Sequence, residues 1–256
     1  MTGIGVEVSG ALGTLIIDNP TRRNAMTADM YEAVPAAVAD VLSHADVRVV
    51  VLRGAETAAF GAGSDISEFP SRRMGDQASV YESAEHRAWQ ALAEIPLPVI
   101  AAIHGPCMGG GVAMALHCDI RIAADDATFS VPPARLGLAY PRRALVRLTE
   151  LVGPATTKLL LYSARVIDAE EALVLGLVQQ VVPKGDLDTE VEKLAEKISR
   201  LAPLTHRATK LSVDSIRDDG LRAAASRAHD DCYASADFRE GIQAFLEKRP
   251  ATFKGS

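Results

Sequence analysis

Three consecutive glycines, Gly109 to Gly111, constrain this chain most, because they lie between an apolar run at residues 98–103 and a small-residue segment at residues 112–116. This order predicts a strand, a turn of bare backbone and the start of a buried helix. Glycine lets the backbone come close to a ligand and direct its N–H groups at it. The sequence therefore predicts a binding site that is built from main chain at this turn.

A second turn of the same kind, residues 60–66 with the sequence Phe-Gly-Ala-Gly-Ser-Asp-Ile, follows an earlier apolar run at residues 47–52. Taken singly, a glycine-rich turn is also typical of an ordinary tight junction between a strand and a helix. Two such turns together can present a pair of N–H donors to one oxygen atom. That geometry is what an oxyanion hole needs.

Short β-branched runs alternate with longer segments of helical period, which favours an α/β fold. Segments 27–43 and 77–94 carry apolar residues at helical spacing, and Thr27 stands where a helix N-cap is expected. Both are predicted to be crossover helices between strands. The predicted strands are residues 12–18, 47–52, 99–103, 120–123 and 178–182.

From Asp186 onward the periodicity predicts helices only. They are expected at residues 191–201, 204–216, 220–234 and 237–248. We therefore predict an α/β core over residues 1–185 and a C-terminal helical region over residues 186–256. Helices with a polar and an apolar side need something to cover, either their own domain or a neighbouring subunit.

Composition excludes several classes of function. The chain has 256 residues, 48% of them apolar, and a formal net charge of −6 with no cluster of basic residues, so a nucleic-acid partner is not expected. No window has the apolar length of a membrane span, and no signal-peptide pattern opens the chain. Three cysteines without metal-ligand spacing predict a cytoplasmic protein without a structural metal. Cys118 is expected to be a small buried residue.

The two turns and the segments around them resemble the crotonase (enoyl-CoA hydratase/isomerase) superfamily over nearly the whole chain. The resemblance implies a crotonase-like α/β fold of repeated ββα units with a C-terminal helical region, in homotrimers that often pair into hexamers. The motifs that carry it are residues 23–26 (Arg-Asn-Ala-Met), 60–66, 104–111, 118–120 (Cys-Asp-Ile), 136–138 (Leu-Gly-Leu) and 245–249 (Phe-Leu-Glu-Lys-Arg).

The resemblance also implies that the substrate is an acyl-CoA thioester, with coenzyme A bound as part of the substrate rather than permanently. Its carbonyl oxygen would be held by the amides of Ser64 and Gly110, which is where an enolate gathers negative charge. The segment around Asp65, which we also expect to cap a turn or helix, would line the coenzyme. The remaining residues implied in coenzyme A contacts are Arg22, Arg23, Ala62, Ile66, Phe245 and Lys248.

This chain departs from the family at the two glutamates that its hydratases share, because those positions hold Ala113 and Pro133. Adding water to a double bond needs a group that activates the water and a group that protonates the α-carbon, and neither residue can do this. Decarboxylation of a malonyl-type thioester needs no base, since loss of carbon dioxide leaves the enolate directly. We therefore predict decarboxylation, with the proton delivered by Tyr140, by the Ser64 hydroxyl or by a trapped water.

Tyr140 and residues 235–248 resemble the methylmalonyl-CoA decarboxylases of the superfamily, but those enzymes carry His and Glu where this chain has Ser64 and Ala113. Two alternatives to decarboxylation follow. One is an enoyl-CoA hydratase or isomerase with a relocated acid/base, and the other is a non-catalytic acyl-CoA-binding protein. Tyr140 itself can also be an aromatic residue whose hydroxyl is bonded to main chain.

Four further side chains lie near the predicted site. Arg142 and Arg143 follow Tyr140 and can meet an anionic group of the substrate, narrow the pocket, or lie in solvent as paired arginines usually do. His104 and His117 flank the glycine turn, and both are expected to be structural rather than catalytic, with His117 pointing into the interior.

Overall fold

The computed structural model describes residues 2–256, which form a central six-stranded sheet, a second sheet of three short strands, and ten α-helices. This architecture confirms the predicted α/β class. In the order in which they pair, the strands of the central sheet are β1 (Gly3–Ser9), β2 (Leu12–Asp18), β3 (Val49–Gly54), β4 (Val99–Ile103), β6 (Ile120–Ala124) and β9 (Gln180–Val182).

Strands β1 and β2 form an antiparallel hairpin, and all later neighbours in this sheet pair in parallel. Parallel strands need crossover connections that cover the faces of the sheet, so they tend to be apolar throughout. Strand β4 shows this directly, because all five of its residues are buried. The carboxyl ends of β3 and β4 lead into the two predicted turns, which the sheet therefore places at one edge.

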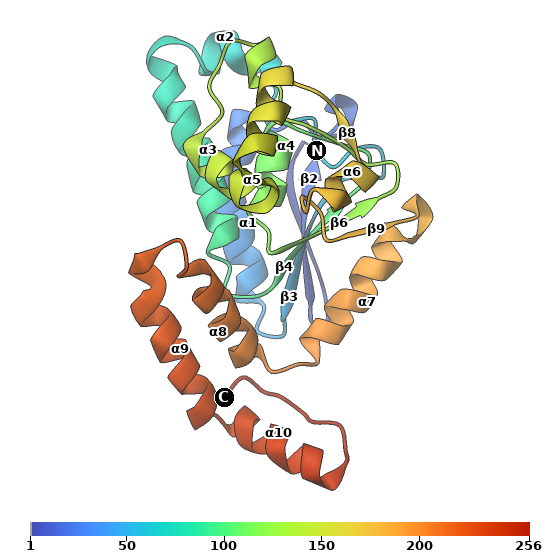
Figure 1. The fold of residues 1–256 in the computed structure, drawn as a ribbon, viewed down its shortest axis with the longest axis vertical. Coiled ribbons are helices and arrows are strands. Elements are labelled where there is room, and N and C mark those ends of the chain that lie inside the picture. The colour runs from blue at the N-terminus through green and yellow to red at the C-terminus, as the bar shows by residue number, and fades with distance from the viewer. Residues whose placement is uncertain (1) are drawn as a thin grey trace.

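The two faces of the sheet are covered by different helices, as Figure 1 shows. Helices α1 (Ala28–Ser43) and α3 (Ala78–Ala93) pack on one face, and α7 (Leu187–Ser199) packs on the other. Because successive side chains of a strand point to opposite faces, Val50 and Leu52 join the first core while Val49 and Val51 join the second. The first core also contains Phe60 at the start of the first turn and Val112 just after the triple glycine.

Helix α1 begins where the sequence predicts, since the Thr27 side chain accepts a hydrogen bond from the Met30 amide and caps the helix. Its buried stripe includes Tyr31, Val34 and Val41 at helical spacing. Helix α3 likewise covers the predicted crossover, with Trp89 on its buried side. Both crossover helices are therefore confirmed.

A smaller sheet and four helices complete the part of the chain around the turns. Strand β5 leads directly into α4, so this sheet holds the triple-glycine turn from one side. The strands are β5 (Pro106–Met108), β7 (Thr128–Ser130) and β8 (Ile167–Asp168), and the helices are α2 (Phe69–Arg72), α4 (Gly110–Leu116), α5 (Arg142–Ser163) and α6 (Ala169–Val174).

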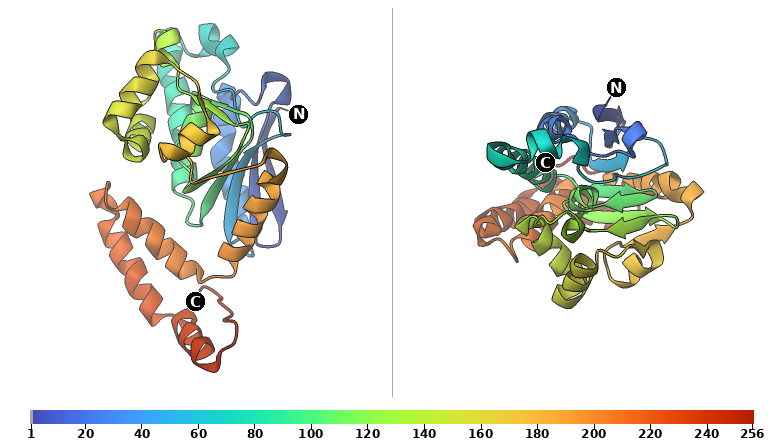
Figure 2. Two further views of the ribbon diagram at one scale, coloured as in Figure 1. Left: turned by 45° about the vertical axis from the view of Figure 1, so that its right-hand side comes forward. Right: turned by 90° about the horizontal axis from the view of Figure 1, so that it is seen from above.

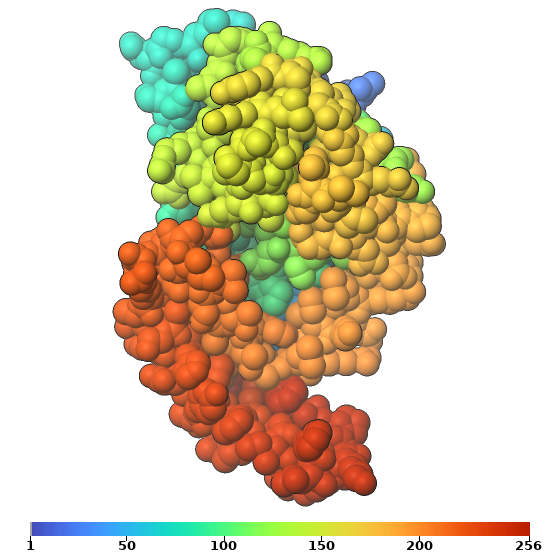
Figure 3. Space-filling view, viewed as in Figure 1, coloured from blue at the N-terminus to red at the C-terminus, as the bar shows by residue number. Residues whose placement is uncertain are grey.

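The last three helices lie beyond one end of the sheet in both Figures 1 and 2. They are α8 (Pro203–Asp214), α9 (Arg222–Ala234) and α10 (Ala236–Glu247). Together with α7 they confirm the four helices predicted after Asp186. In the space-filling view they form an arm beside the rest of the molecule (Figure 3). Since α7 packs on the sheet, the arm begins at α8; the division into domains at residue 186 stays a prediction.

Four strands were not predicted from the sequence. Strand β1 contains two glycines and lies at the edge of the sheet with exposed residues at its end, so its apolar signal is weak. Strands β5, β7 and β8 have two or three residues each, too few to show a period. Predicted strand 47–52 is displaced to Val49–Gly54, and predicted strand 178–182 is shortened to Gln180–Val182.

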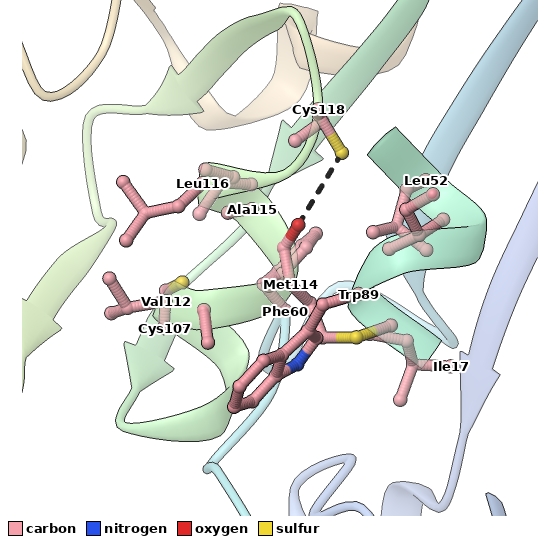
Figure 4. Close-up of a cluster of buried hydrophobic side chains, with 14 of the residues drawn as sticks. Ile17, Leu52, Phe60, Trp89, Cys107, Val112, Met114, Ala115, Leu116 and Cys118 are labelled. Carbon is pink, nitrogen blue, oxygen red and sulfur yellow. Dashed lines mark hydrogen bonds between the residues drawn. The ribbon is translucent and has the colours of Figure 1, made fainter. Parts of the chain in front are cut away.

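The interior around α4 is an apolar cluster, shown in Figure 4. The indole of Trp89 lies beside Phe60 and Met114 in this cluster. Cys118 is buried and its thiol donates to the Met114 carbonyl at 3.7 Å, which confirms the prediction of a small buried residue. Burial raises the pKa of the Cys118 thiol to about 12, so it remains protonated at neutral pH.

Residues 2–256 contain neither a membrane-spanning helix nor a cluster of metal ligands. No helix there combines the length and the apolar character that crossing a membrane requires. No group of three or more His, Cys, Asp or Glu side chains in that range is arranged to hold a metal ion.

Packing of α7 on the sheet predicts a stability difference between two valines. Val191 is 3% exposed within the second core, whereas Val174 at the end of α6 is 85% exposed. Val191→Ala should lower the free energy of unfolding by about 2 kcal/mol, because it deletes buried methyl groups and leaves a cavity. Val174→Ala should change it by less than about 0.5 kcal/mol. Urea unfolding measures both, and equal effects would show that α7 is not part of the core.

Candidate active site

The two glycine-rich turns are joined to each other through their backbones. Gly61 donates to the Pro106 carbonyl at 3.1 Å, and Met108 donates to the Gly61 carbonyl at 2.8 Å, which makes a parallel bridge between the turns. A second bridge ties the first turn to Met26, whose amide donates to the Gly63 carbonyl at 2.7 Å. The turns are therefore fixed relative to each other by main chain alone.

This close approach explains why glycine occupies these positions. A methyl group at Gly111 would lie 2.5 Å from the Gly61 carbonyl oxygen, and one at Gly110 would lie 2.3 Å from the Tyr31 hydroxyl. Gly63 has φ +95°, and a methyl group there would lie 3.0 Å from the Met108 carbonyl oxygen. A side chain at any of these positions would push the turns apart.

The contact places the amides of Ser64 and Gly110 side by side. A methyl group on Gly110 would lie 3.2 Å from the Ser64 nitrogen. Gly110 is the first residue of α4, where helix geometry leaves the N–H without a partner in the helix. Within residues 2–256, neither amide donates a hydrogen bond. Two neighbouring free donors of this kind can bind one oxygen that carries negative charge.

A cavity of about 100 Å³ opens beside these amides. Its wall is mainly apolar. Among the described residues that line it, Glu85 is the only one with a carboxylate. The residues that line it are Ala62, Gly63, Ser64, Ile66, Phe69, Arg73, Glu85, Trp89, Met108, Gly109, Gly110, Pro132, Pro133, Leu136, Leu138, Tyr140 and Pro141.

The Ser64 hydroxyl is the centre of a buried hydrogen-bond network. Its oxygen lies 3.0 Å from the Tyr31 hydroxyl and donates to Glu85 Oε1 at 3.0 Å. Since Ser64 uses its own proton toward Glu85, the Tyr31 hydroxyl is the donor to Ser64. Both the amide and the hydroxyl of Ser64 are thus held in place, one by the turn and the other by side chains of α1 and α3.

Glu85 is 3% exposed and is paired with Arg73, which follows α2. The guanidinium donates to both carboxylate oxygens, each at 3.1 Å, and lies over the rings of Phe69 and Tyr81. Burial raises the pKa of Glu85, and the charge of Arg73 opposes that rise. Burial also raises the pKa of Tyr31 well above its ordinary value, so its hydroxyl stays protonated.

Tyr140 lines the cavity, as predicted, but its hydroxyl donates to the Gly109 carbonyl at 3.0 Å. Tyr140 therefore contacts the triple-glycine turn at Gly109, whereas the Tyr31 hydroxyl lies beside Gly110. Burial raises the pKa of the Tyr140 hydroxyl above its ordinary value, which disfavours loss of its proton. The sequence left two hypotheses open for Tyr140, a proton donor or an aromatic residue whose hydroxyl is bonded to main chain. The structure shows the hydroxyl bonded to main chain.

The positions of the two family glutamates carry no group that can move a proton. Ala113 is completely buried in α4, and Pro133 is buried and forms part of the cavity wall. Where the hydratases of the family are expected to have carboxylates, this chain therefore has a buried methyl group at Ala113 and an apolar part of the cavity wall at Pro133.

Arg142 and Arg143 begin α5 as exposed residues and do not line the cavity, so the solvated arrangement is the one observed. His117 stacks on Trp89, and its Nδ1–H donates to the Ala113 carbonyl at 2.7 Å. Burial lowers the pKa of His117 to about 4, which keeps it neutral at physiological pH. His104 Nε2 lies 3.2 Å from Asp188, away from the cavity lining. Both histidines are structural, as predicted.

The predicted coenzyme contacts fall into two groups. Asp65 caps the following turn by accepting from the Ser67 amide, and Arg22 lies 3.4 Å from Asp65. Arg23 and Ile66 are the next residues in the chain after Arg22 and Asp65. Ala62 and Ile66 line the cavity. Phe245 and Lys248, in contrast, belong to the end of α10, which lies at the opposite end of the molecule from α2 (Figure 1). A single chain does not bring the two groups together.

Sequence reasoning missed Glu85 and Arg73. The available signal was the position of Glu85 on α3, four residues after Tyr81 and four before Trp89, which puts a carboxylate on the buried stripe of an amphipathic helix. A charge at such a position requires a partner. Nothing in the sequence identifies that partner as Arg73, which lies in a segment without helical period.

Residues 7–256 match the sequence profile of the family described as Enoyl-CoA hydratase/isomerase. The chain belongs to this family, the crotonase superfamily. It is 35% identical over 251 residues to the Crotonyl-CoA hydratase of Syntrophomonas wolfei, covering 97% of this chain and 96% of that protein. It is 31% identical to the Short-chain-enoyl-CoA hydratase of Clostridium acetobutylicum, with the same coverage of 97% and 96%.

Solved structures of the crotonase superfamily also match this fold closely. The chain superposes on the Enoyl-CoA Hydratase of Bacillus anthracis with a TM-score of 0.92 and 30% identity, over 99% of this chain and 100% of that one. The crotonase-like fold predicted from the motifs is thereby confirmed. The resemblance to methylmalonyl-CoA decarboxylases stays a prediction.

The contact between Gly110 and Tyr31 predicts non-additive effects of mutation. Gly110→Ala should lower the free energy of unfolding by about 2 kcal/mol, because the methyl group overlaps the Tyr31 hydroxyl. Combining it with Tyr31→Phe removes that oxygen, so the double variant should recover about 1 kcal/mol relative to the sum of the single changes. Urea unfolding measures each free energy. Tyr162→Phe, at an exposed tyrosine, is the control and should be additive with Gly110→Ala; additivity for Tyr31→Phe as well would refute the contact.

Proposed function

We propose that this chain is an acyl-CoA enzyme that holds the thioester carbonyl oxygen between the amides of Ser64 and Gly110 and stabilises the enolate formed from it. The observation that carries the proposal is the pair of neighbouring free N–H groups beside the cavity. Membership of the enoyl-CoA hydratase/isomerase family supports it. Each donor of this kind typically contributes about 3 kcal/mol of transition-state stabilisation in a site that excludes water.

The coenzyme would extend from the cavity toward the segment that carries Arg22, Arg23, Ala62, Asp65 and Ile66. Ala62 and Ile66 line the cavity, and the two arginines supply positive charge beside it for the anionic phosphates. Arg22 is already paired with Asp65 and Ser67, so a phosphate would have to share or replace those contacts.

The reaction that we propose first is decarboxylation of a malonyl-type thioester. The bond between the α-carbon and the carboxylate breaks, its electrons form the enolate, carbon dioxide leaves, and one proton is added at the α-carbon. Ala113 and Pro133 support this reaction because it needs no group that activates water. The apolar wall also disfavours a bound carboxylate relative to the enolate held by the amides. Of the predicted proton donors, the Ser64 hydroxyl and a trapped water are favoured, because the Tyr140 hydroxyl is bonded to the Gly109 carbonyl.

Hydration of a 2-enoyl thioester is the second candidate. Two observations favour it: the relatives from Syntrophomonas wolfei and Clostridium acetobutylicum are named hydratases, and Glu85 provides one carboxylate in the cavity wall. One carboxylate is sufficient if it takes a proton from water as oxygen bonds to the β-carbon and then returns it to the α-carbon. A binder of acyl-CoA without chemistry is the remaining alternative.

These reactions are separated by incubation of the protein with malonyl-, methylmalonyl- and 2-enoyl-CoA in deuterated water, followed by mass spectrometry. We expect loss of carbon dioxide from a malonyl-type substrate with one deuterium retained at the α-carbon. A reaction without protein is the control, because malonyl thioesters also lose carbon dioxide slowly in solution.

Hydration of the enoyl thioester without decarboxylation would contradict the first candidate and support the second. Binding of all thioesters without turnover would contradict both and support the binder. Failure to bind any thioester would contradict the proposed function itself.

We also propose that the arm formed by α8, α9 and α10 is covered by another copy of this chain, as the predicted homotrimer or hexamer requires. Phe245 is 84% exposed and Leu246 is 74% exposed on α10, and an apolar groove of about 830 Å³ runs between the three helices. Large apolar side chains grouped on one surface are typical of an interface between proteins. The arrangement would also let Phe245 and Lys248 meet a coenzyme bound to a neighbouring chain.

Light scattering during size-exclusion chromatography tests the assembly. Wild type should elute with at least three times the mass of one chain, and Phe245→Asp combined with Leu246→Asp should reduce that mass, because two charges would be buried at the interface. Val174→Asp, at an equally exposed valine on α6, is the matched control and should leave the mass unchanged. A monomeric wild type would contradict the proposed assembly.

A further inference from the structure

The proposed enolate chemistry needs a group that carries a proton, and this group has not yet been assigned. A proton must be added to, or taken from, the α-carbon beside the thioester carbonyl. Ala113 and Pro133 cannot carry it, and the hydroxyl of Tyr140 is bonded to the Gly109 carbonyl. The group that remains is the carboxylate of Glu85, which lies in the cavity wall.

Glu85 lies directly behind the residue that supplies one of the two amides. Its Oε1 accepts the Ser64 hydroxyl proton at 3.0 Å, and the Ser64 amide is the proposed donor to the carbonyl oxygen. The hydroxyl and the amide of one residue are necessarily close together, so Ser64 stands between Glu85 and a bound thioester. The Tyr31 hydroxyl, at 3.0 Å, holds the Ser64 oxygen from the other side.

Building on the proposed function, we infer that Glu85 stores the proton that is exchanged at the α-carbon and moves it through the Ser64 hydroxyl. When the enolate forms by loss of an α-proton, the C–H bond breaks, its proton joins the Ser64 oxygen, and the Ser64 proton passes to the Glu85 carboxylate. When an enolate is protonated, whether it arose in this way or by loss of carbon dioxide, the Ser64 proton joins the α-carbon and protonated Glu85 returns a proton to the Ser64 oxygen. Nothing is oxidised or reduced, and the net charge is conserved at each step.

The surroundings of Glu85 suit a group that changes its protonation. Arg73 binds both oxygens and stabilises the ionised form, while burial favours the neutral form, and burial outweighs the arginine in raising the pKa. The other titratable or charged groups that face it are Tyr31, Tyr81, Tyr140 and, one turn earlier on α3, Glu82. The tyrosines remain neutral because burial raises the pKa of each.

A purely structural role for Glu85 makes different predictions. The pair with Arg73 ties the segment after α2 to α3, and a buried ion pair can serve only to fix that segment. In that case Glu85→Gln would lower stability and substrate binding. It would leave the pH dependence of proton exchange as it is in wild type.

The test measures exchange of the α-protons of butyryl-CoA for deuterium in deuterated water, by mass spectrometry, with the full-length protein. Glu85→Gln keeps the size and one acceptor oxygen but cannot take a proton, so exchange should fall by about 100-fold or more. Ser64→Ala keeps the amide and removes the relay, so it should cause a loss of similar size. Glu82→Gln, at an exposed glutamate of the same helix, is the control and should remain within about twofold of wild type.

The pH profile separates a proton carrier from a structural residue. Exchange begins with the ionised carboxylate, so its rate should rise as the pH rises through the pKa of Glu85, which burial raises from its ordinary value. Glu85→Gln should remove this rise while thermal unfolding and butyryl-CoA binding, measured in parallel, show that the variant is folded and loaded.

Three results would overturn the inference. The first is a pH profile of exchange in Glu85→Gln that is the same as in wild type. The second is a fall in the exchange rate of about 100-fold in Tyr140→Phe but not in Glu85→Gln, and the third is a wild type that binds butyryl-CoA but does not exchange its α-protons. All three leave the proposed carbonyl site intact, because they concern the proton and not the oxygen. Failure of wild type to bind any thioester would instead refute the proposed function, and the inference with it.

Discussion

The backbone bridge between the two glycine-rich turns is the contact on which the site depends. Gly61 pairs with the strand that precedes the triple glycine, and a side chain at Gly111 would collide with the Gly61 carbonyl. Because the turns follow neighbouring parallel strands, β3 and β4, the sheet delivers both to the same edge. The amides of Ser64 and Gly110 are adjacent as a consequence of this pairing, so no side chain has to build the oxyanion-binding geometry.

Side chains have two roles in the site: they support the turns, and in the proposed chemistry they carry the proton. Tyr31 lies beside Gly110, Tyr140 donates to the Gly109 carbonyl, and the Ser64 hydroxyl donates to the buried ion pair of Glu85 with Arg73. Burying two charges is costly unless both are fully hydrogen-bonded. Here each carboxylate oxygen has a partner, which lets a carboxylate remain beside an otherwise apolar cavity.

The sequence predicted the elements whose signal is local. Thr27 marks the start of α1 and the apolar spacing of α3 marks its buried side, so both helices were found. The glycines of the two turns predicted the main-chain site for the same reason. Glu85 was missed because a glutamate on a helix usually faces solvent, and its pairing with Arg73 exists only after the chain folds.

The central claim is that the Ser64 and Gly110 amides polarise a thioester carbonyl, and difference infrared spectroscopy tests it most directly. The carbonyl stretch of butyryl-CoA labelled with carbon-13 at the thioester carbon is compared free in solution and bound to the protein. Two hydrogen bonds to the oxygen weaken the C=O bond, so the account predicts a shift to lower frequency on binding. A bound thioester with the frequency of the free one would contradict it.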